Sequence, residues 1–355
     1  MWIDLLRVDG LRNLADIELR PSPGINVIHG SNASGKTSLL ESIYLLGRGR
    51  SFRSQRSLPL IQKGREQFTA FAVLRNAQGT KKTMGISRST EGFEIHVDRE
   101  RVKRLSELAK VFPFQIVTPR SHEILDAGAK FRRRMLDWGV FHVEPGFHHW
   151  YTRYRAALSQ RNAALRQGMS DLGIWDKEMT QAAGYVEKAR DAYIAELKRL
   201  FETTAQELNG LDCHYVFRFL RGYPKDMTLL EALDKSRIED RKRGYTYYGP
   251  HRADFRIICE RGDASDVASG GQKRLLVFTL NIAQADIVRT KTNHTPIWLL
   301  DDFTAELDRE NRKELLSKIA GLAEQVFVTT TDPELVEFQG VSIDGMFHVE
   351  HGRIV

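Results

Sequence analysis

One octapeptide decides the fold of this chain: Gly30-Ser31-Asn32-Ala33-Ser34-Gly35-Lys36-Thr37, which fits the pattern G-x-x-x-x-G-K-[ST]. An apolar run at 25–29 predicts a buried strand before it, and an apolar stripe at helical spacing over 39–46 predicts a helix after it. Glycines let the backbone curl around phosphates, and the first N–H groups of the helix favour an anion. In such a loop Lys36 reaches the β- and γ-phosphates, and the Thr37 hydroxyl ligates Mg²⁺. The sequence therefore predicts a nucleotide-binding site.

The bulk composition sets wider limits. The chain has 355 residues, enough for two domains, and its formal net charge of +7 suits a polyanionic partner without requiring one. Cys213 and Cys259 lie far apart without the spacing of a metal motif, so we expect two reduced thiols and neither a disulfide nor a zinc site. The N-terminus has no signal-peptide core, and no apolar run is long enough to span a bilayer. We therefore expect a cytoplasmic protein without a membrane partner.

The type of structural signal changes twice along the chain. Strand signals dominate residues 1–118, apart from the helix after the phosphate loop. Residues 119–235 carry two aromatic and aliphatic stripes at helical spacing, with a break at 168–173, which we expect to pack as antiparallel helices. Strand signals return within 236–355. This pattern predicts an α/β domain in two halves, 1–118 and 236–355, with a helical domain inserted between them.

A further signal lies near the C-terminus, where the apolar run 297–300 predicts a buried strand followed by Asp301 and Asp302. An acid at the carboxyl end of a parallel strand can face a phosphate loop and hold Mg²⁺, directly or through water. We predict Asp301 as the metal-side carboxylate and Asp302 as the general base that polarises the attacking water. The alternative is a solvated pair of acids, but a phosphate loop in the same chain favours the catalytic interpretation.

The segment Ser269-Gly270-Gly271-Gln272 predicts a second anion site at the start of a helix. Ser269 is a natural N-cap, and the two glycines expose backbone N–H groups. By itself the segment could be only a well-capped helix start. A chain with one nucleotide has no need of two phosphate sites, however, so we expect this one to serve the nucleotide of another copy of the chain.

The order of these motifs resembles a known class of ATPases. A phosphate loop, S-G-G-Q, an apolar strand with an acidic pair and then Ala305-Glu306-Leu307-Asp308 are similar to the ABC-type ATPase head, whose signature motif is S-G-G-Q and whose D-loop is A-x-L-D. Within that class the chain resembles the RecF family of bacterial DNA replication and repair proteins. The segments that carry this resemblance spread over nearly the whole chain: 49–53, 132–137, 248–254 and 300–303. The implied fold is a split α/β P-loop domain with mixed sheets plus an inserted α-helical domain.

The resemblance implies a role for each matching residue. Lys36 and Asp302 are the implied catalytic residues, and Thr37 and Asp301 the Mg²⁺ ligands. The implied nucleotide-binding set comprises Gly30, Ser31, Asn32, Ala33, Ser34, Gly35, Lys36, Thr37 and Ser38, together with Arg12 and Asn13. The signature residues Ser269, Gly270, Gly271 and Gln272 are implied to act across an ATP-bound dimer, where Ser269 and Gly271 contact the γ-phosphate of the other chain. Asp308 is implied to lie at the interface.

The chain departs from the general ABC pattern at two positions. The catalytic carboxylate is usually Glu, whereas Asp302 is one methylene shorter. The switch position after the next strand is usually His, whereas this chain has Thr329-Thr330-Thr331-Asp332. Both departures resemble RecF rather than transporters, and we expect slow turnover.

Basic residues gather in four clusters: Arg48/Arg50/Arg53/Arg56, Arg99/Arg101/Lys103/Arg104, Arg132/Arg133/Arg134 and Arg241/Lys242/Arg243. A single cluster is more often a solvated face than a nucleic-acid contact, but together they suit non-specific phosphate binding. Since no base-reading motif is apparent, we expect DNA to be recognised by shape or end structure. The DNA candidates are Arg50, Arg53, Arg132, Arg133 and Arg134.

The resemblance thus implies an ATP-dependent DNA-binding protein of recombinational repair and replication-fork maintenance, and we expect ATP to close a dimer on DNA and slow hydrolysis to release it. The resemblance implies a part in the DNA-damage and SOS responses. It also implies binding to double-stranded DNA or single-strand/duplex junctions without base specificity, and recombinase loading with RecO and RecR. Three alternatives are a transporter subunit, a small-molecule kinase and the head of a chromosome-organising complex. The basic clusters disfavour the first, and the lack of a long coiled-coil arm disfavours the last.

Overall fold

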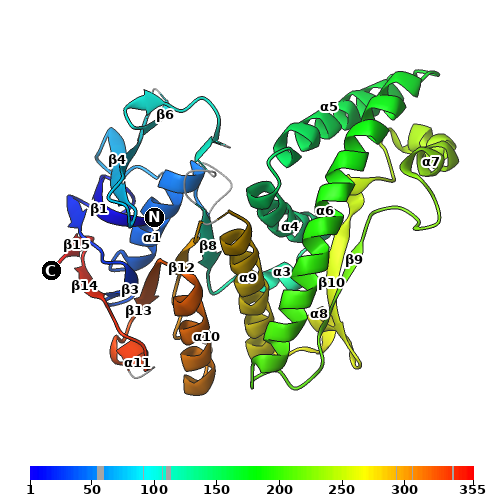
Figure 1. Cartoon of the computed structure of the whole chain (residues 1–355). Helices are drawn as coiled ribbons and strands as arrows, with labels where there is room; N and C mark the ends of the chain where they lie inside the picture. Colours follow the sequence, from blue (N-terminus) through cyan, green and yellow to red (C-terminus); the bar gives the residue numbers. More distant parts are fainter. Residues whose placement is uncertain are drawn as a thin grey trace. The chain divides into compact units, whose positions relative to one another are not determined.

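The computed structural model describes all residues except 54–59, 91, 106, 109–112, 293, 306 and 338–339. Its described residues form two compact units (Figure 1). The first unit contains Met1–Ser121 and Val288–Val355, and the second contains His122–Ile287. The three-part division expected from the sequence, with boundaries after 118 and 235, stays a prediction.

An antiparallel six-stranded sheet forms one layer of the first unit. Its strands run in the order β2-β1-β4-β5-β6-β7. Their bounds are Trp2–Asp9 (β1), Ile17–Leu19 (β2), Gln67–Arg75 (β4), Lys81–Ser89 (β5), Phe93–Val97 (β6) and Glu100–Arg101 (β7). In β4, buried and more exposed residues alternate, as expected for a strand with one face on the core.

The second sheet of this unit is mainly parallel and has the order β15-β14-β3-β13-β12-β8. Its strands are Gly24–His29 (β3), Phe114–Val117 (β8), Ile297–Leu300 (β12), Gln325–Thr330 (β13), Gly345–Glu350 (β14) and Arg353–Ile354 (β15). Every residue of β12 and β13 is buried, as expected for central parallel strands covered on both faces. This arrangement places the ends of β3 and β12 at the same edge of the sheet.

The helices of the first unit include α1 (Lys36–Arg48), α10 (Arg309–Leu322) and α11 (Glu334–Glu337). Helix α1 contributes Leu39, Leu40 and Ile43 to one hydrophobic cluster that also contains residues of both sheets. It therefore belongs to the core that the two sheets share. The helix ends at Gly49, whose φ of 62° lies in the left-handed region and whose N–H donates to the Leu45 carbonyl. The predicted strand, loop and helix around the octapeptide are therefore confirmed.

The second unit is mostly helical. Its helices are Glu123–Asp126 (α3), Ala129–Val143 (α4), Phe147–Arg166 (α5), Gly173–Glu207 (α6), Leu229–Arg243 (α7), Pro250–Arg252 (η1) and Ala264–Val267 (α8); helix α9 (Gly270–Thr292) begins in this unit and ends in the first. The long helices α5 and α6 lie side by side (Figure 1), with the predicted break between them. Among the described helices, none is both long enough and apolar enough to cross a bilayer.

A short antiparallel sheet also belongs to the second unit, in the order β11-β10-β9. Its strands are Val216–Leu220 (β9), Asp254–Cys259 (β10) and Gly262–Asp263 (β11). Strand β9 lies within the stretch that we expected to be helical. Its partner strand β10 is far away in the sequence. A strand of five residues also has too few residues to show a clear periodicity.

Candidate functional site

The octapeptide forms a tight loop between β3 and α1. Gly30 has a φ of 151°, and a Cβ there would lie 2.2 Å from the Val349 carbonyl oxygen. Gly35 has a φ of 125°, and a Cβ would lie 2.9 Å from Leu14 Cδ2. Both positions therefore favour glycine for conformational and steric reasons. The loop delivers Lys36 to the first turn of α1, where backbone N–H groups have no partner within the helix.

Lys36 is held by the loop itself. Its Nζ donates to the carbonyl oxygens of Gly30 and Ser31, at 2.7 and 2.8 Å. Within the described part of the chain, no carboxylate oxygen lies within 4 Å of the ammonium. Burial lowers the pKa of Lys36, although the charges of Asp302 and Asp301 oppose that change. A phosphate would therefore supply the counter-charge that this buried ammonium lacks.

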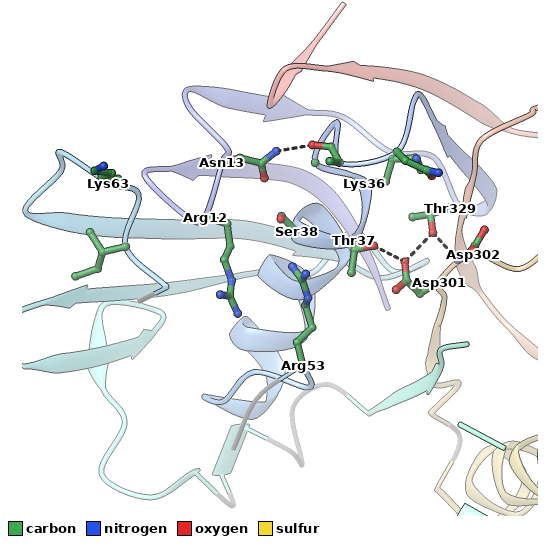
Figure 2. A pocket seen from close by; sticks show the side chains of 14 residues that line it. Arg12, Asn13, Lys36, Thr37, Ser38, Arg53, Lys63, Asp301, Asp302 and Thr329 are labelled. Carbon is green, nitrogen blue, oxygen red and sulfur yellow. Dashed lines mark hydrogen bonds between the residues drawn. The ribbon is translucent and has the colours of Figure 1, made fainter. Parts of the chain in front are cut away.

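The acidic pair lies beside Thr37 (Figure 2). Asp301 Oδ1 accepts hydrogen bonds from the hydroxyls of Thr37 and Thr329, each at 2.9 Å. Burial raises the pKa of Asp301, and these two hydrogen bonds oppose the shift. A hydroxyl and a carboxylate that converge in this way are hard oxygen donors of the kind that Mg²⁺ prefers, so the residues present fit this cation.

Asp302 leaves the strand end with a φ of 48°, in the left-handed region. Its backbone N–H donates to Thr329 Oγ1 at 2.8 Å. Thr329 therefore contacts both acids. It belongs to the segment at the end of β13, where ABC-type ATPase heads usually have the switch histidine. This unusual backbone turn is the local reason that Asp301 and Asp302 can both reach one cavity.

That cavity has a volume of about 930 Å³, within the range of pockets that hold cofactor-sized ligands. Most of the predicted nucleotide-binding residues line it (Figure 2). The lining residues are Arg12, Asn13, Asn32, Ala33, Gly35, Lys36, Thr37, Ser38, Arg53, Ile61, Lys63, Asp301, Asp302 and Thr329. Of the remaining loop residues, Gly30 and Ser31 hold Lys36, and the buried Ser34 hydroxyl has no hydrogen-bond partner among the described residues.

Sequence reasoning missed Glu41, Ile61 and Lys63. Glu41 is fully buried on α1, and its carboxylate accepts from Arg12 Nε and Nη2 at 3.0 and 2.9 Å. An acidic residue inside an apolar helical stripe was the only available signal for it. Lys63 and Ile61 come from a segment that pairs with Leu11 and its neighbours, a placement that the sequence does not reveal.

Arg53 lines the nucleotide cavity, with Nη1 3.6 Å from Glu41 Oε2. Its side chain points toward the phosphate loop (Figure 2), and its assignment as a DNA candidate stays a prediction. Asn13 also contacts the loop, since its Nδ2 donates to the Ala33 carbonyl at 3.1 Å. Arg50 and Arg53 are both exposed, and Arg56 lies outside the described residues.

The three neighbouring arginines on α4, Arg132, Arg133 and Arg134, lie in three different environments. Arg132 is only 3% exposed, and its Nε and Nη2 donate to Asp254 at 2.7 and 2.9 Å, while Nη1 donates to backbone carbonyls. The enclosure of this guanidinium disfavours Arg132 as a DNA contact, and the assignment stays a prediction. Arg133 is half-buried and donates to the Ala253 carbonyl at 2.6 Å. Only Arg134 is exposed, over the ring of Phe131.

The signature segment forms a capped helix start, as predicted. Gln272 N–H donates to Ser269 Oγ at 3.3 Å, and Ser269 N–H donates to Gln272 Oε1 at 2.9 Å. This reciprocal pair has the form of a capping box. Ser269 and Gly270 are exposed, and a Cβ added at Gly270 would meet nothing within 4 Å. A large group could therefore approach the start of α9 closely.

Asp308 has a local structural role that the sequence analysis did not assign. It is the N-cap of α10, where its carboxylate accepts from Asn311 N at 2.8 Å and from Asn311 Nδ2 at 2.6 Å. The backbone hydrogen bond from Asn311 is the main reason that the pKa of Asp308 is lowered. An interface role for Asp308 stays a prediction. Glu306 of the same segment lies outside the described residues.

Comparisons with known proteins cover nearly the whole chain. Residues 2–355 match the family model for the RecF/RecN/SMC N-terminal domain. The DNA replication and repair protein RecF of Pseudomonas aeruginosa strain LESB58 is 40% identical over 361 residues, covering 100% of this chain and 97% of the relative. The protein of the same name from Pseudomonas fluorescens strain Pf-5 is 41% identical over 360 residues, covering 100% and 98%.

Solved structures agree with the expected fold. The recombination mediator protein RecF with ATP in the RecFOR pathway superposes with a TM-score of 0.87 at 28% identity, covering 100% of this chain and 97% of that one. An SMC head bound to the C-terminal winged-helix domain of ScpA gives a TM-score of 0.62 at 16% identity, covering 100% and 97%. This second likeness shows the fold alone, and both support the predicted ATPase head with an inserted helical region.

Proposed function

Because this chain belongs to the RecF family, we propose that it is an ATP-dependent DNA-binding protein of recombinational repair and replication-fork maintenance. The relatives named above are DNA replication and repair proteins, which supports the repair role. The observation that carries the proposal is the convergence of Lys36, Thr37, Asp301 and Asp302 on one cavity. These are the groups that nucleotide hydrolysis requires.

In the proposed reaction Lys36 exchanges the carbonyl oxygens of Gly30 and Ser31 for phosphate oxygens of ATP. Thr37 and Asp301 would hold Mg²⁺, which when bound neutralises charge on the transferred phosphoryl group. Asp302 would orient and deprotonate the attacking water as general base. Since its carboxylate is one methylene shorter than the usual Glu, we expect weak, slow hydrolysis to ADP and phosphate.

We further propose that the signature segment acts on the nucleotide of a second chain. Its support is the exposed helix start at Ser269 and Gly270, where a Cβ added at Gly270 would meet nothing within 4 Å. Two chains that share two nucleotides would be stabilised as a dimer by mass action. ATP would thus close the dimer, and hydrolysis would open it.

DNA is the proposed partner of the closed dimer, bound through phosphates without base specificity. The net charge of +7 and exposed arginines such as Arg50 and Arg134 support this, since phosphate contacts release counter-ions. Double-stranded DNA or single-strand/duplex junctions are the expected forms. The RecFOR pathway named for the similar structures supports RecO- and RecR-type partners.

The mass of the purified protein in solution tests this proposal. It would be measured without nucleotide and with ADP, ATP or a non-hydrolysable ATP analogue, each with and without duplex DNA. We expect a dimer only with ATP or the analogue, and tighter DNA binding by that form. The variant Ser269→Arg should bind ATP as a monomer, with Ser265→Arg as a matched control nearby. A mass that does not respond to nucleotide would exclude the two-chain mechanism.

A further inference from the structure

The two cysteines, far apart in sequence, lie close together in space. Cys259 is the last residue of β10, Glu260 begins the turn to β11, and Cys213 precedes β9. The antiparallel pairing of β9 with β10, with Val216 opposite Ile258, brings these segments together. The two sulfur atoms and a Glu260 carboxylate oxygen all lie within 4.8 Å of one another. The sequence spacing gave no sign of this cluster.

We propose that Cys213, Cys259 and Glu260 form a binding site for a thiophilic divalent cation of the zinc class. Two thiolates and one carboxylate are established zinc ligands, and three protein ligands leave one position of a tetrahedral site for water. From zinc bond lengths of about 2.0–2.3 Å, the ligand atoms of such a site lie about 3.3–3.8 Å apart. The observed limit of 4.8 Å therefore requires a contraction of about 1.0–1.5 Å at most.

A cation explains this cluster better than a disulfide does. A disulfide would involve only the sulfur atoms of Cys213 and Cys259. The Glu260 carboxylate beside them would then have no role in the cluster. Cation binding uses all three groups, with both thiol protons released to solvent as the two thiolates form. The three resulting negative charges would exceed the two positive charges of the cation by one. The neighbouring guanidinium of Arg261 supplies one further positive charge.

The proposed cation site is connected to the signature segment through Asp212. Its Oδ1 accepts from Arg261 Nη2 at 2.8 Å and from Gln272 Nε2 at 2.6 Å. Asp212 is next to Cys213 in the chain, and Arg261 is next to Glu260. A cation that ties these segments together would therefore fix Asp212, which accepts from Gln272, and Arg261, which donates to Asp212. This consequence, unlike the site itself, rests on the proposed function, in which Gln272 belongs to the ATP-dependent interface.

The test uses the full-length chain, reduced and freed of metal, with Co²⁺ and then Zn²⁺ as probes and excess Mg²⁺ present. We expect one equivalent of Co²⁺ per chain with the charge-transfer absorption of thiolate–cobalt bonds, and its displacement by Zn²⁺. Since loss of an outer-shell partner already weakens metal sites by about 10- to 100-fold, Cys213→Ser and Cys259→Ser should each weaken Zn²⁺ binding by at least about 100-fold. Glu260→Gln should weaken it less, and the distant control Glu66→Gln should have no effect.

Absence of the thiolate–cobalt absorption in the folded wild-type chain would overturn the proposal, whatever the variants do. So would equal Zn²⁺ affinity of wild type and the double variant Cys213→Ser, Cys259→Ser. A disulfide formed between the two thiols by hydrogen peroxide would instead lower the mass of the chain by two hydrogen atoms. If this happened rapidly and the reduced chain bound no metal, the two cysteines would be a redox pair. Because these measurements need no ATP, failure here is distinguishable from failure of the proposed ATP-dependent dimer.

Discussion

Two buried sites, one in each compact unit, use charge in opposite ways. In the second unit Arg161 is fully buried, with Nε 2.6 Å from Asp176 Oδ1 and Nη1 2.7 Å from Asp240 Oδ2. In the first unit Lys36 and Asp301 are also buried, yet across the described residues neither forms an ion pair within 4 Å. The site around Arg161 satisfies its buried charge internally, whereas Lys36 and Asp301 face a cavity.

This difference separates structural charges from those that await a ligand. A buried charge with a matched partner contributes little net stability, but loss of its partner is strongly destabilising. A buried charge without a counter-ion costs stability until a ligand of opposite sign arrives. Basic or acidic residues in a sequence can therefore be assigned to function only after their partners within the fold are known.

Asp240→Asn should give the largest effect on stability. It removes one of the two carboxylates that neutralise Arg161, and loss of a buried partner costs about 3–5 kcal/mol. Asp240 Oδ1 also accepts from the Tyr247 N–H at 2.9 Å, so the loop after α7 should loosen. Urea unfolding of the full chain would measure this, with the exposed Asp234→Asn as control. A loss below about 1 kcal/mol would contradict the structural interpretation of this charge.

Lys36→Met should leave the nucleotide-free fold as stable as wild type but weaken ATP binding by about 100-fold, or about 2.7 kcal/mol. The reason is that Lys36 donates only to loop carbonyls until a phosphate arrives. Calorimetric titration with ATP would measure the affinity, and urea unfolding the stability. Lys81→Met, an exposed position on β5, is the matched control. Unfolding of the Lys36 variant would mean that this charge is structural after all.

The sequence predicted the parts of the site that are local in the chain. The octapeptide, the acidic strand end and the capped start of α9 each carry their geometry within a few consecutive residues, and all three formed as expected. The parallel strand order then brought Asp301 to Thr37. These local patterns were also sufficient for the fold class.

Features that depend on distant partners could not be predicted in this way. Arg132 and Arg134 are two residues apart and look alike in sequence, but only one faces Asp254. The proximity of Cys213 to Cys259 depends on the register of β9 with β10, and Lys63 reaches the cavity only through pairing with the segment near Leu11. Helical or strand periodicity indicates which face is buried, not what lies opposite it.

Asp301→Asn is the same substitution as Asp240→Asn and should have the opposite outcome for stability. Burial raises the pKa of Asp301 above its usual range, so its charged form destabilises the fold at neutral pH, and the neutral amide should leave stability unchanged or raise it. Mg²⁺-dependent phosphate release should fall by about 10- to 100-fold. In wild type, protons compete with Mg²⁺, so activity should decline as pH falls through this raised pKa. A destabilised Asn variant would break the comparison between the two units.

Arg134→Ala should have the smallest effect, a two- to fivefold loss of DNA affinity, or about 0.4–1 kcal/mol, because an exposed arginine contributes one phosphate contact among several. Its stability should stay within about 0.5 kcal/mol of wild type, since surface substitutions rarely do more. Arg132→Ala, two residues away, should instead destabilise the second unit, because the Asp254 carboxylate would keep only the longer ion pair with Arg256, at 3.4 Å. Binding of labelled duplex at several salt concentrations would separate the two, because only loss of a phosphate contact lowers the salt dependence of the folded protein. If Arg132→Ala folded normally and lost DNA affinity, Arg132 would be a DNA contact despite its burial, and paired charge in this unit could no longer be taken as structural.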